Sequence, residues 1–556
     1  MSKNKITKLH EVSCVKKDNT PSLSPALIRV ESAVKWAVAI SVMSYVVYRI
    51  FALDLTSDEW GSMKAIYCKS LADLIVFKYV SAQSHFLQSV FSTLFFKSFP
   101  EAYEVAAIRL PTLIGLLCYL YAAYRITAMI KTRFLSVLGF VAICTNAFLL
   151  DYFGLARGYG MALGFQLLSL CHLINVFCSP PEGSMKSMHL AIWFACFAVL
   201  SNLAWMYFYG AVCAMLLLHI YGSEPGGRLQ SRLLRTLTAG QSVIYNALLV
   251  GVFYLPRVIL LTEHNELYFG GVNGFVEDTV KSLVRGAMYI RIEQERGYYL
   301  FLAYGVAFFC GVTAVIALTR WWWGRIEEGC HLVKASGVIS AVLLMSVAII
   351  EGMHYFFNVK FIIERAATGL LAVGICHLVM FGVSVKRLWR VVMVGLLILI
   401  VMVGMANLNL NRWSLPGCSQ LREFVRWIGD ARAQNSGRHL IIGTDSGCNW
   451  PMWYYIENIL GLTESEETKA SIGFVRIYNG VTLYSVNLPE NKSLFDDNTD
   501  FLLLNHRDTP GKYPRPLRLV KQYHNAQLDL FACEGERSLK RDASSRFKGV
   551  IYPVTF

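Results

Sequence analysis

Long apolar stretches separated by short polar or basic segments make up most of the chain. Eleven of them have the composition and approximate length of membrane-spanning helices, which need about 20 apolar residues. They are residues 33–53, 107–129, 133–150, 159–178, 189–203, 205–221, 238–262, 298–319, 334–351, 364–384 and 391–407. A further apolar segment, 84–99, is shorter and carries several polar side chains, which favours an interfacial helix. The pattern predicts a polytopic α-helical membrane protein with about eleven spans.

The segments between the predicted spans differ in charge. If 84–99 does not cross the membrane, every strongly basic segment falls on the same side as the N-terminus. These segments contain Lys131 and Arg133, then Lys186, then Arg228, Arg232 and Arg235, then Arg320, Arg325 and Lys334, and finally Lys386, Arg387 and Arg390. Because cytoplasmic loops are enriched in Lys and Arg, we expect the N-terminus inside and the C-terminus outside.

Composition agrees with a membrane protein. Of the 556 residues, 55% are hydrophobic and 16% are charged, whereas soluble domains contain about 25% charged residues. The net charge of +14 comes largely from the basic segments between spans, so no nucleic-acid partner is expected. The fourteen cysteines are scattered, many of them within apolar stretches, and are expected to be small buried side chains.

The chain divides into three regions. Residues 1–32 are expected to be a cytoplasmic tail, and 33–410 the transmembrane module with outer loops 54–106 and 263–297. The second loop is too long for an ordinary connection, so we expect it either to order over a site or to form an irregular cap. Residues 411–556 are soluble in character and are predicted to lie outside the membrane.

The soluble region shows a simple alternation of elements. Apolar runs at 438–445, 500–505 and 528–532 are typical of buried strands, and 451–458 is typical of a helix. This alternation predicts a small extracytoplasmic α/β domain. No glycine fingerprint for a nucleotide is present, so we expect the domain to face the acceptor or to stabilise the protein.

Ionisable residues gather in the segments that the predicted topology places outside. Asp58 and Glu59 follow the first span, His85 opens the interfacial helix, Asp151, Arg157 and Tyr159 lie in the next outer segment, and His354, Lys360 and Arg365 lie in a later one. Charged side chains are costly beside a bilayer and are therefore functional candidates. An acid near arginines would make a general base beside a cationic clamp for phosphate.

Each of these residues also has a purely structural interpretation. Asp58 and Glu59 are compatible with solvated loop acids, and Glu59 with orienting its loop. His85 is compatible with an ordinary interfacial histidine. Arg157 and Arg365 each need an anion, which is either an acid such as Asp58 or a lipid phosphate.

The order of these residues resembles the GT-C glycosyltransferases, and within them the protein O-mannosyltransferase and lipid A aminoarabinose transferase branch. The matching segments are Asp58-Glu59 after the first span, Ser84-His85 at the start of an apolar helix, Ala107-Ile108-Arg109-Leu110-Pro111 at the next span, Leu155-Ala156-Arg157-Gly158-Tyr159, and Ile363-Glu364-Arg365-Ala366. The resemblance covers most of the chain and depends on order and spacing more than on any single motif.

The resemblance implies an inverting glycosyltransferase that takes a sugar from a polyprenyl-phosphate donor on the outer face of the membrane. Asp58 matches the family's catalytic aspartate and would remove the proton of the acceptor hydroxyl. Arg157 and Arg365, with His85 as a further donor of hydrogen bonds, would stabilise the leaving phosphate. The acceptor would be a glycolipid, a glycan or a protein. The compact loops favour a bacterial inner membrane, with the C-terminal domain periplasmic or extracellular.

The chain departs from the family pattern at one important point. Many relatives carry a second acid shortly after the Ala-Arg pair, where this chain has Gly158-Tyr159 and its nearest acid is Asp151. A metal-binding second carboxylate is therefore in doubt, and no metal or other cofactor is expected. Arg109 is expected to anchor a helix end by snorkelling.

Other classes stay open from the sequence. A transporter for lipid-linked sugars would place charged residues deep within several spans and show internal repeats. A glycan polymerase or ligase that uses the same lipid carriers would also carry outer arginines, and the Asp58-Glu59 pair directly after the first span favours GT-C over it. An inactive protein that keeps the fold is a third possibility, against which the presence of Asp58 argues.

Overall fold

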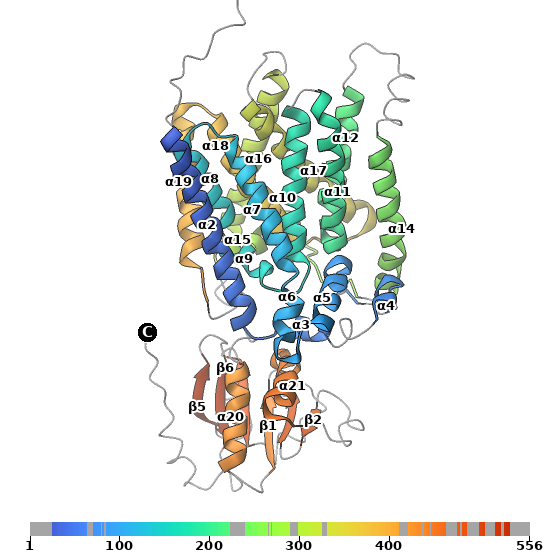
Figure 1. Cartoon of the computed structure of the whole chain (residues 1–556), viewed down its shortest axis with the longest axis vertical. Helices are drawn as coiled ribbons and strands as arrows, with labels where there is room; N and C mark the ends of the chain where they lie inside the picture. Colours follow the sequence, from blue (N-terminus) through green and yellow to red (C-terminus); the bar gives the residue numbers. More distant parts are fainter. Residues whose placement is uncertain are drawn as a thin grey trace, which may run out of the picture.

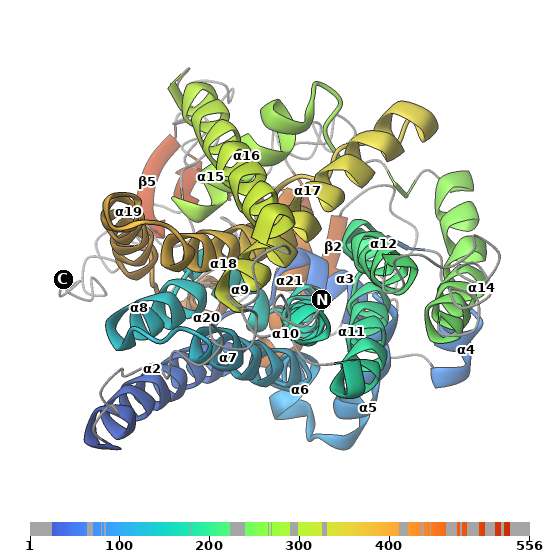
Figure 2. The ribbon, with the colours of Figure 1, turned by 90° about the horizontal axis from the view of Figure 1, so that it is seen from above.

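The computed structural model describes residues 25–63, 70–78, 81–82, 85–178, 181–222, 240–264, 266–267, 269–289, 298–324, 331–410, 421–434, 439–444, 446–462, 475–478, 481–485, 500–505, 517–523 and 528–533. Its larger part is a bundle of long helices that run roughly side by side (Figures 1 and 2). They are α2 (Pro25–Ala52), α7 (Thr112–Ala128), α8 (Arg133–Cys144), α10 (Tyr159–Cys178), α11 (Pro181–Ser201), α12 (Met206–Gly222), α14 (Gln241–Glu263), α16 (Tyr298–Gly324), α17 (His331–Phe357), α18 (Thr368–Ser384) and α19 (Arg387–Ala406).

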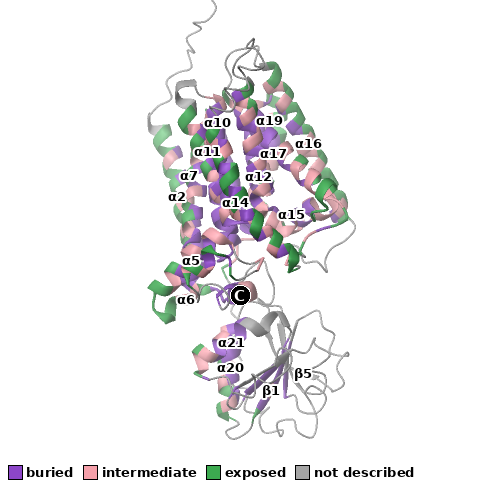
Figure 3. Ribbon diagram, turned by 90° about the vertical axis from the view of Figure 1, so that its right-hand side faces the viewer, coloured by how far each residue is buried: buried purple, intermediate pink, exposed green. Residues whose placement is uncertain are grey.

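Each of the eleven predicted spans overlaps one of these helices over most of its length, which confirms the polytopic helical fold. Within the described residues, nine helical segments are long and apolar enough to cross a membrane, and α8 and the apolar part of α11 are shorter. Large apolar side chains on outer helices are exposed, such as Val252, Phe301 and Phe308. Figure 3 shows exposed residues along outer helices of the bundle, among them α2 and α16. Exposed apolar surface of this extent is expected where lipid surrounds the helices.

The predicted span 133–150 is wrong in its second half. Helix α8 ends at Cys144, and a separate helix α9 (Ala147–Phe153) follows. Asn146 caps α9 because its side chain accepts the backbone N–H of Leu149 at 3.1 Å. An Asn cap competes with continued helix, so Asp151 lies on a helix and not in an outer loop.

Shorter helices gather at one end of the bundle. They are α3 (Ser57–Ser62), α4 (Leu71–Ile75), α5 (Phe86–Ser98) and α6 (Glu104–Arg109), next to the short 3-10 segment Glu101–Tyr103. In Figure 1 they lie at the end of the bundle nearest to the C-terminal domain, with α4 set apart beside the end of α14. Helix α5 has 13 residues and does not run through the bundle, in agreement with the interfacial helix predicted at 84–99. Ser84 lies outside the described residues.

The C-terminal region is an α/β domain, as predicted. Its elements are α20 (Leu421–Gln434), β1 (Leu440–Thr444), α21 (Ser446–Leu460), β2 (Val475–Tyr478), β3 (Val481–Ser485), β4 (Phe501–Asn505), β5 (Leu517–Tyr523) and β6 (Leu528–Cys533). The strands form one mixed sheet in the order β2-β3-β1-β4-β6-β5. Strand β1 pairs in parallel with β3 and β4, and the outer pairs are antiparallel. The sequence had indicated β1, β4, β6 and α21, but not the remaining elements.

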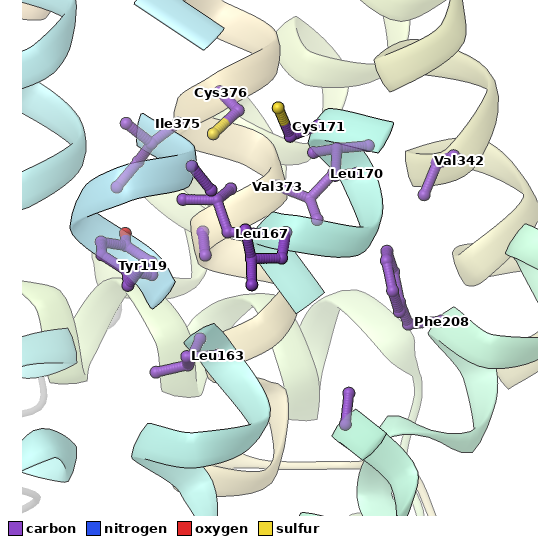
Figure 4. Close-up of a cluster of buried hydrophobic side chains, with 14 of the residues drawn as sticks. Tyr119, Leu163, Leu167, Leu170, Cys171, Phe208, Val342, Val373, Ile375 and Cys376 are labelled. Atoms are coloured by element: carbon purple, nitrogen blue, oxygen red, sulfur yellow. The ribbon is translucent and has the colours of Figure 1, made fainter. Parts of the chain in front are cut away.

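Helices α7 and α10 pack with their backbones in close contact. A Cβ on Gly164 would lie 2.0 Å from the carbonyl oxygen of Gly115, so only glycine fits there. Small residues that allow such contact are typical of helix pairs in membranes. The centre of the bundle is filled by apolar side chains and cysteines, including Tyr119, Leu167 and Cys376 (Figure 4). This packing fixes the position of α10, which begins at Tyr159, two residues after Arg157.

The start of the first helix and the C-terminal domain lie at opposite ends of the bundle. Helix α2 begins at the end away from the α/β domain and ends next to it (Figure 1). This arrangement is the one that an odd number of spans requires. Which end faces the cytoplasm stays a prediction from the positive-inside rule.

Cysteine-accessibility labelling checks that orientation. Single cysteines at Lys386 and at Gly226 are expected to be protected from a membrane-impermeant reagent added outside, and cysteines at Asn273 and Asn435 are expected to react. Gly226 and Asn435 lie outside the described residues. Labelling of positions 435 and 386 from the same side would contradict the eleven-span topology.

Candidate active site

The Asp58-Glu59 pair lies on the short helix α3, which begins five residues after α2 ends. Thr56 caps this helix: its hydroxyl accepts the N–H of Glu59 at 3.3 Å, and the Glu59 carboxylate accepts the N–H of Thr56 at 3.0 Å. This reciprocal capping box satisfies two helix-end N–H groups. Neighbouring residues on a helix point in different directions, so the two carboxylates are separated. The capping box holds the Glu59 side chain in the interior of the protein.

Glu59 is completely buried in an ion pair with Arg109. The Arg109 Nε and Nη2 atoms donate to the two carboxylate oxygens at 2.8 and 2.7 Å, and the Ala156 N–H donates to Oε1 at 2.9 Å. Burial alone would raise the pKa of Glu59, but Arg109 and the backbone N–H groups outweigh it and lower that pKa. The expectation that Arg109 snorkels is wrong, because its side chain is fully buried.

Arg109 also holds the chain between α2 and α3. It donates to the backbone carbonyls of Ile50, Leu53 and Asp54 at 3.2, 2.9 and 2.8 Å. The end of the first span therefore has a fixed geometry, with its last carbonyls satisfied by a buried guanidinium.

Asp58 lies between two arginines that are distant in sequence. Its Oδ2 atom is 2.8 Å from Nη1 of Arg157 and 2.6 Å from Nη1 of Arg365. Arg157 is nearly buried, with 7% of its side chain exposed, while Asp58 and Arg365 are 29% and 21% exposed. Burial would raise the pKa of Asp58, but the charges of Arg157 and Arg365 outweigh it and hold that pKa below its ordinary value. Asp58 is therefore a carboxylate at neutral pH.

The Arg157 guanidinium retains donor capacity. Its Nε atom is buried and has no hydrogen-bond partner among the residues that the structure describes, and its contact with Asp58 through Nη1 is an ion pair without hydrogen-bond geometry. A buried cation with unused donors is costly unless an anion completes its contacts. An additional anion with several acceptor oxygens would satisfy it.

Gly158 allows the close approach of a histidine to this site. Its φ of +71° lies in the left-handed region, and a Cβ there would be 2.1 Å from the Ser201 carbonyl and 2.9 Å from Cβ of His85. Glycine is therefore required between Arg157 and α10. The ring of His85 contacts that of Tyr159 edge-on, with 5.5 Å between centroids.

His85 is held in its neutral form. Burial, and then the charges of Arg157 and Arg365, lower its pKa well below the ordinary value. Its Nε2 atom is buried without a hydrogen-bond partner among the described residues. A neutral imidazole still offers one donor and one acceptor, and the role of His85 as a donor to phosphate stays a prediction.

This state of His85 predicts a pH dependence of stability. In the unfolded chain, His85 takes up a proton below about pH 6.5. In the folded protein it stays neutral at that pH, because its pKa is well below the ordinary value. The free energy of unfolding is thus expected to be highest above that pH and to decrease as the pH falls below it. Melting temperatures at pH 7.5 and 5.5 check this. His85→Gln should reduce the difference in melting temperature between the two pH values. His264→Gln, which changes an exposed histidine, should leave that difference unchanged. An equal pH difference in His85→Gln and the unmutated protein would contradict it.

A loop and two short helices hold Arg365 from its other side. Gly271 and Phe361 exchange two backbone hydrogen bonds of 2.9 Å, and the Thr279 hydroxyl donates to the Ile362 carbonyl at 2.6 Å. The described part of the predicted loop 263–297 contains the π-helix η4 (Phe275–Val280) and α15 (Lys281–Ala287). It packs against the segment that carries Arg365, whose guanidinium lies 5.1 Å from the ring centroid of Phe269.

Glu364 adopts a strained conformation directly before Arg365. Its φ of +48° is rare for a residue other than glycine. Its N–H donates to the Ser282 hydroxyl at 2.8 Å, and its carboxylate pairs with Arg285. Such strain persists only where the surroundings enforce it, and it is frequent at functional sites. The sequence analysis missed Arg285 and Ser282. Both contact Glu364, about 80 residues away, and no local pattern in a loop indicates such a distant contact.

The remaining predicted site residues lie elsewhere. Asp151 on α9 pairs with Arg49 of α2 at 2.5 Å, both completely buried. His354 lies on the last turn of α17, donates from Nδ1 to the Val359 carbonyl at 2.9 Å and stacks on Phe361. Lys360 is exposed on the same loop. The contacts described for Asp151 and His354 are structural, so their supporting role stays a prediction. Among the described residues, no three His, Cys, Asp or Glu side chains are grouped as a metal site.

No protein-family model and no curated protein matches this chain. Solved structures do. ArnT from Cupriavidus metallidurans bound to undecaprenyl phosphate is 10% identical, with a TM-score of 0.37 over 91% of this chain and 99% of that chain. The Archaeoglobus fulgidus oligosaccharyltransferase tethered to an acceptor peptide is 11% identical, with a TM-score of 0.39 over 91% of this chain and 75% of that chain. Both are GT-C membrane glycosyltransferases, the superfamily that the sequence resembles. Because these TM-scores are below 0.5, we base the functional conclusions on the geometry of the site.

Proposed function

We propose that the chain is a membrane glycosyltransferase that moves a sugar from a polyprenyl-phosphate donor to an acceptor hydroxyl, with Asp58 as the general base. The observation that carries this proposal is the contact of one Asp58 oxygen with both Arg157 and Arg365, at 2.8 and 2.6 Å. This pair of cations lies at the end of a bundle of apolar helices, where a lipid phosphate would be found. The arrangement offers an acid-base group beside a site for an anion.

The proposed reaction is a single displacement. The acceptor oxygen forms a bond to the anomeric carbon as the bond between that carbon and the donor phosphate oxygen breaks. Asp58 takes the proton of the acceptor hydroxyl, and the phosphate leaves with the bonding electrons as polyprenyl phosphate. One displacement at one carbon inverts its configuration. Arg157 and Arg365 stabilise the charge that grows on the phosphate.

The two arginines serve both anions in this proposal. In the structure they lower the pKa of Asp58, which makes it a weak base. A donor phosphate shares the guanidinium groups with Asp58 and offsets part of their charge, so the pKa of Asp58 rises when the donor is bound. The proton acceptor is then strengthened only in the complex that is ready to react.

Of the two roles that the sequence allows for Glu59, catalytic acid or residue that orients its loop, the proposal assigns it the second. Both of its oxygens are engaged by Arg109, Thr56 and the Ala156 N–H, so it has no oxygen left for an acceptor. Its contribution is to fix α3 and thereby the direction of Asp58. No metal step is part of the proposal. The acceptor is a glycolipid, a glycan or a protein, and the site would face the outside of a bacterial inner membrane.

Identification of the bound lipid tests the proposal. Purification with native lipids, followed by mass spectrometry, is expected to show a polyprenyl monophosphate that carries one sugar. Incubation with an acceptor extract should convert it to free polyprenyl phosphate with loss of the sugar. Passage of an intact lipid-linked sugar across vesicles without cleavage would indicate a transporter, and a co-purifying polyprenyl pyrophosphate glycan would indicate a polymerase or ligase.

A further inference from the structure

Helix α3 contacts the α/β domain as well as the helix bundle. On the bundle side, Glu59 pairs with Arg109. On the other side, the ring of Trp60 meets that of Trp453 on α21 edge-on, with 5.6 Å between centroids. Leu55, Trp60 and Met63 belong to the same buried apolar cluster as residues of α20 and α21, among them Phe424, Met452 and Ile456. The helix that carries Asp58 is thus part of the core of the C-terminal domain.

Two polar side chains of the domain hold the residues just before α3. The hydroxyl of Tyr455 accepts the N–H of Leu55 at 2.7 Å, and both residues are buried. The Arg422 side chain forms an ion pair with Asp54 and donates to the Ala52 carbonyl at 2.5 Å. These contacts, together with those of Arg109, fix the turn between α2 and the Thr56 cap.

We propose that the α/β domain is a component of the active centre, in which Tyr455 and Arg422 are positioning residues for Asp58. This inference rests on the proposed role of Asp58 as the base. Helix α3 has six residues, and so short a helix is not stable by itself in water. Its position is therefore set by its two neighbours. A displacement of a reacting group by about 1 Å costs on the order of 100-fold in rate.

Two variants with matched controls test this in the full-length protein. Tyr455→Phe removes only the hydroxyl that accepts the Leu55 N–H. Tyr454→Phe is its control, because the Tyr454 hydroxyl bonds to Glu104 at 3.5 Å. Arg422→Ala removes the ion pair with Asp54, and Arg426→Ala changes an exposed arginine one turn later on the same helix.

The first measurement is hydrogen–deuterium exchange of the peptide that covers residues 53–63. Exchange is expected to be several-fold faster in Tyr455→Phe and Arg422→Ala than in their controls. The second is donor cleavage: kcat is expected to fall by about tenfold or more, from partial misplacement of the base. Binding of a polyprenyl phosphate, which depends on Arg157 and Arg365, should stay within about twofold. This split between kcat and binding is not expected from general loss of folding.

The outcomes separate this inference from the proposed function. Unchanged exchange of residues 53–63 in both variants would overturn the positioning role of the domain. Faster exchange together with an unchanged kcat would show that the position of Asp58 does not limit the reaction, which contradicts its role as the base. A parallel loss of exchange protection throughout the bundle would also overturn the inference, because it would show that the domain stabilises the whole protein and not α3 in particular.

Discussion

Asp58→Asn is expected to reduce sugar transfer by a factor of about 10²–10⁴, the usual contribution of a general base. The amide is close in shape to the carboxylate but does not take up a proton. It also removes the negative charge that lies 2.8 Å from Arg157 and 2.6 Å from Arg365. Because the two guanidinium groups then lack their carboxylate, a polyprenyl phosphate is expected to bind at least as tightly as to the unmutated protein.

The combination of lost transfer and retained phosphate binding distinguishes a base from a structural acid. If Asp58 only neutralised the arginines, its loss would lower the melting temperature, and added polyprenyl phosphate would restore both stability and transfer. Asp73→Asn provides the control, because Asp73 lies in the same predicted outer loop and pairs with Lys78 at the surface. Unchanged transfer in Asp58→Asn would remove Asp58 as the base.

The spans were predictable because they depend on local information. A stretch of apolar residues shows its own length and polarity, and all eleven predicted segments overlap long helices of the bundle. The break in 133–150 was not predicted, because the apolar residues around Asn146 indicated a continuous span. In the structure Asn146 ends that continuity by capping α9. In the soluble domain, β1, β4 and β6 were evident as apolar runs. The amphipathic α20, whose buried face includes Phe424 and Ile428, was missed although its apolar spacing is that of a helix.

The gathering of Asp58, Arg157 and Arg365 also followed from sequence, because the positive-inside rule and the number of spans place their segments on one side. What the sequence does not contain is the pairing of individual charges. Arg109 and Glu59 are 50 residues apart, and each looked like a boundary residue. Their pair, and that of Arg285 with Glu364, depends on tertiary packing that no local pattern reports. The same holds for the contact of the α/β domain with α3.

Arg365→Lys is expected to weaken binding of a polyprenyl phosphate nearly as much as Arg365→Ala does, within a few-fold. A guanidinium grips phosphate through two parallel hydrogen bonds, which the point charge of lysine does not reproduce. Hydrogen bonds to charged groups contribute about 1.5–3 kcal/mol, so a loss of about 10- to 100-fold in affinity is expected. Arg390→Lys controls for the general effect of the exchange, because Arg390 donates to the Val385 carbonyl in the turn before α19.

The structure adds a competing explanation, because Arg365 also pairs with Asp58. If that ion pair were its only function, Arg365→Ala would lower the melting temperature, Arg365→Lys would largely restore it, and phosphate binding would not change. Repeating both substitutions in the Asp58→Asn background separates the two roles, since the ion pair is then absent. A direct contact with phosphate predicts that the loss of affinity persists in this background. If the loss disappears there, Arg365 acts through Asp58 and the phosphate clamp is misplaced.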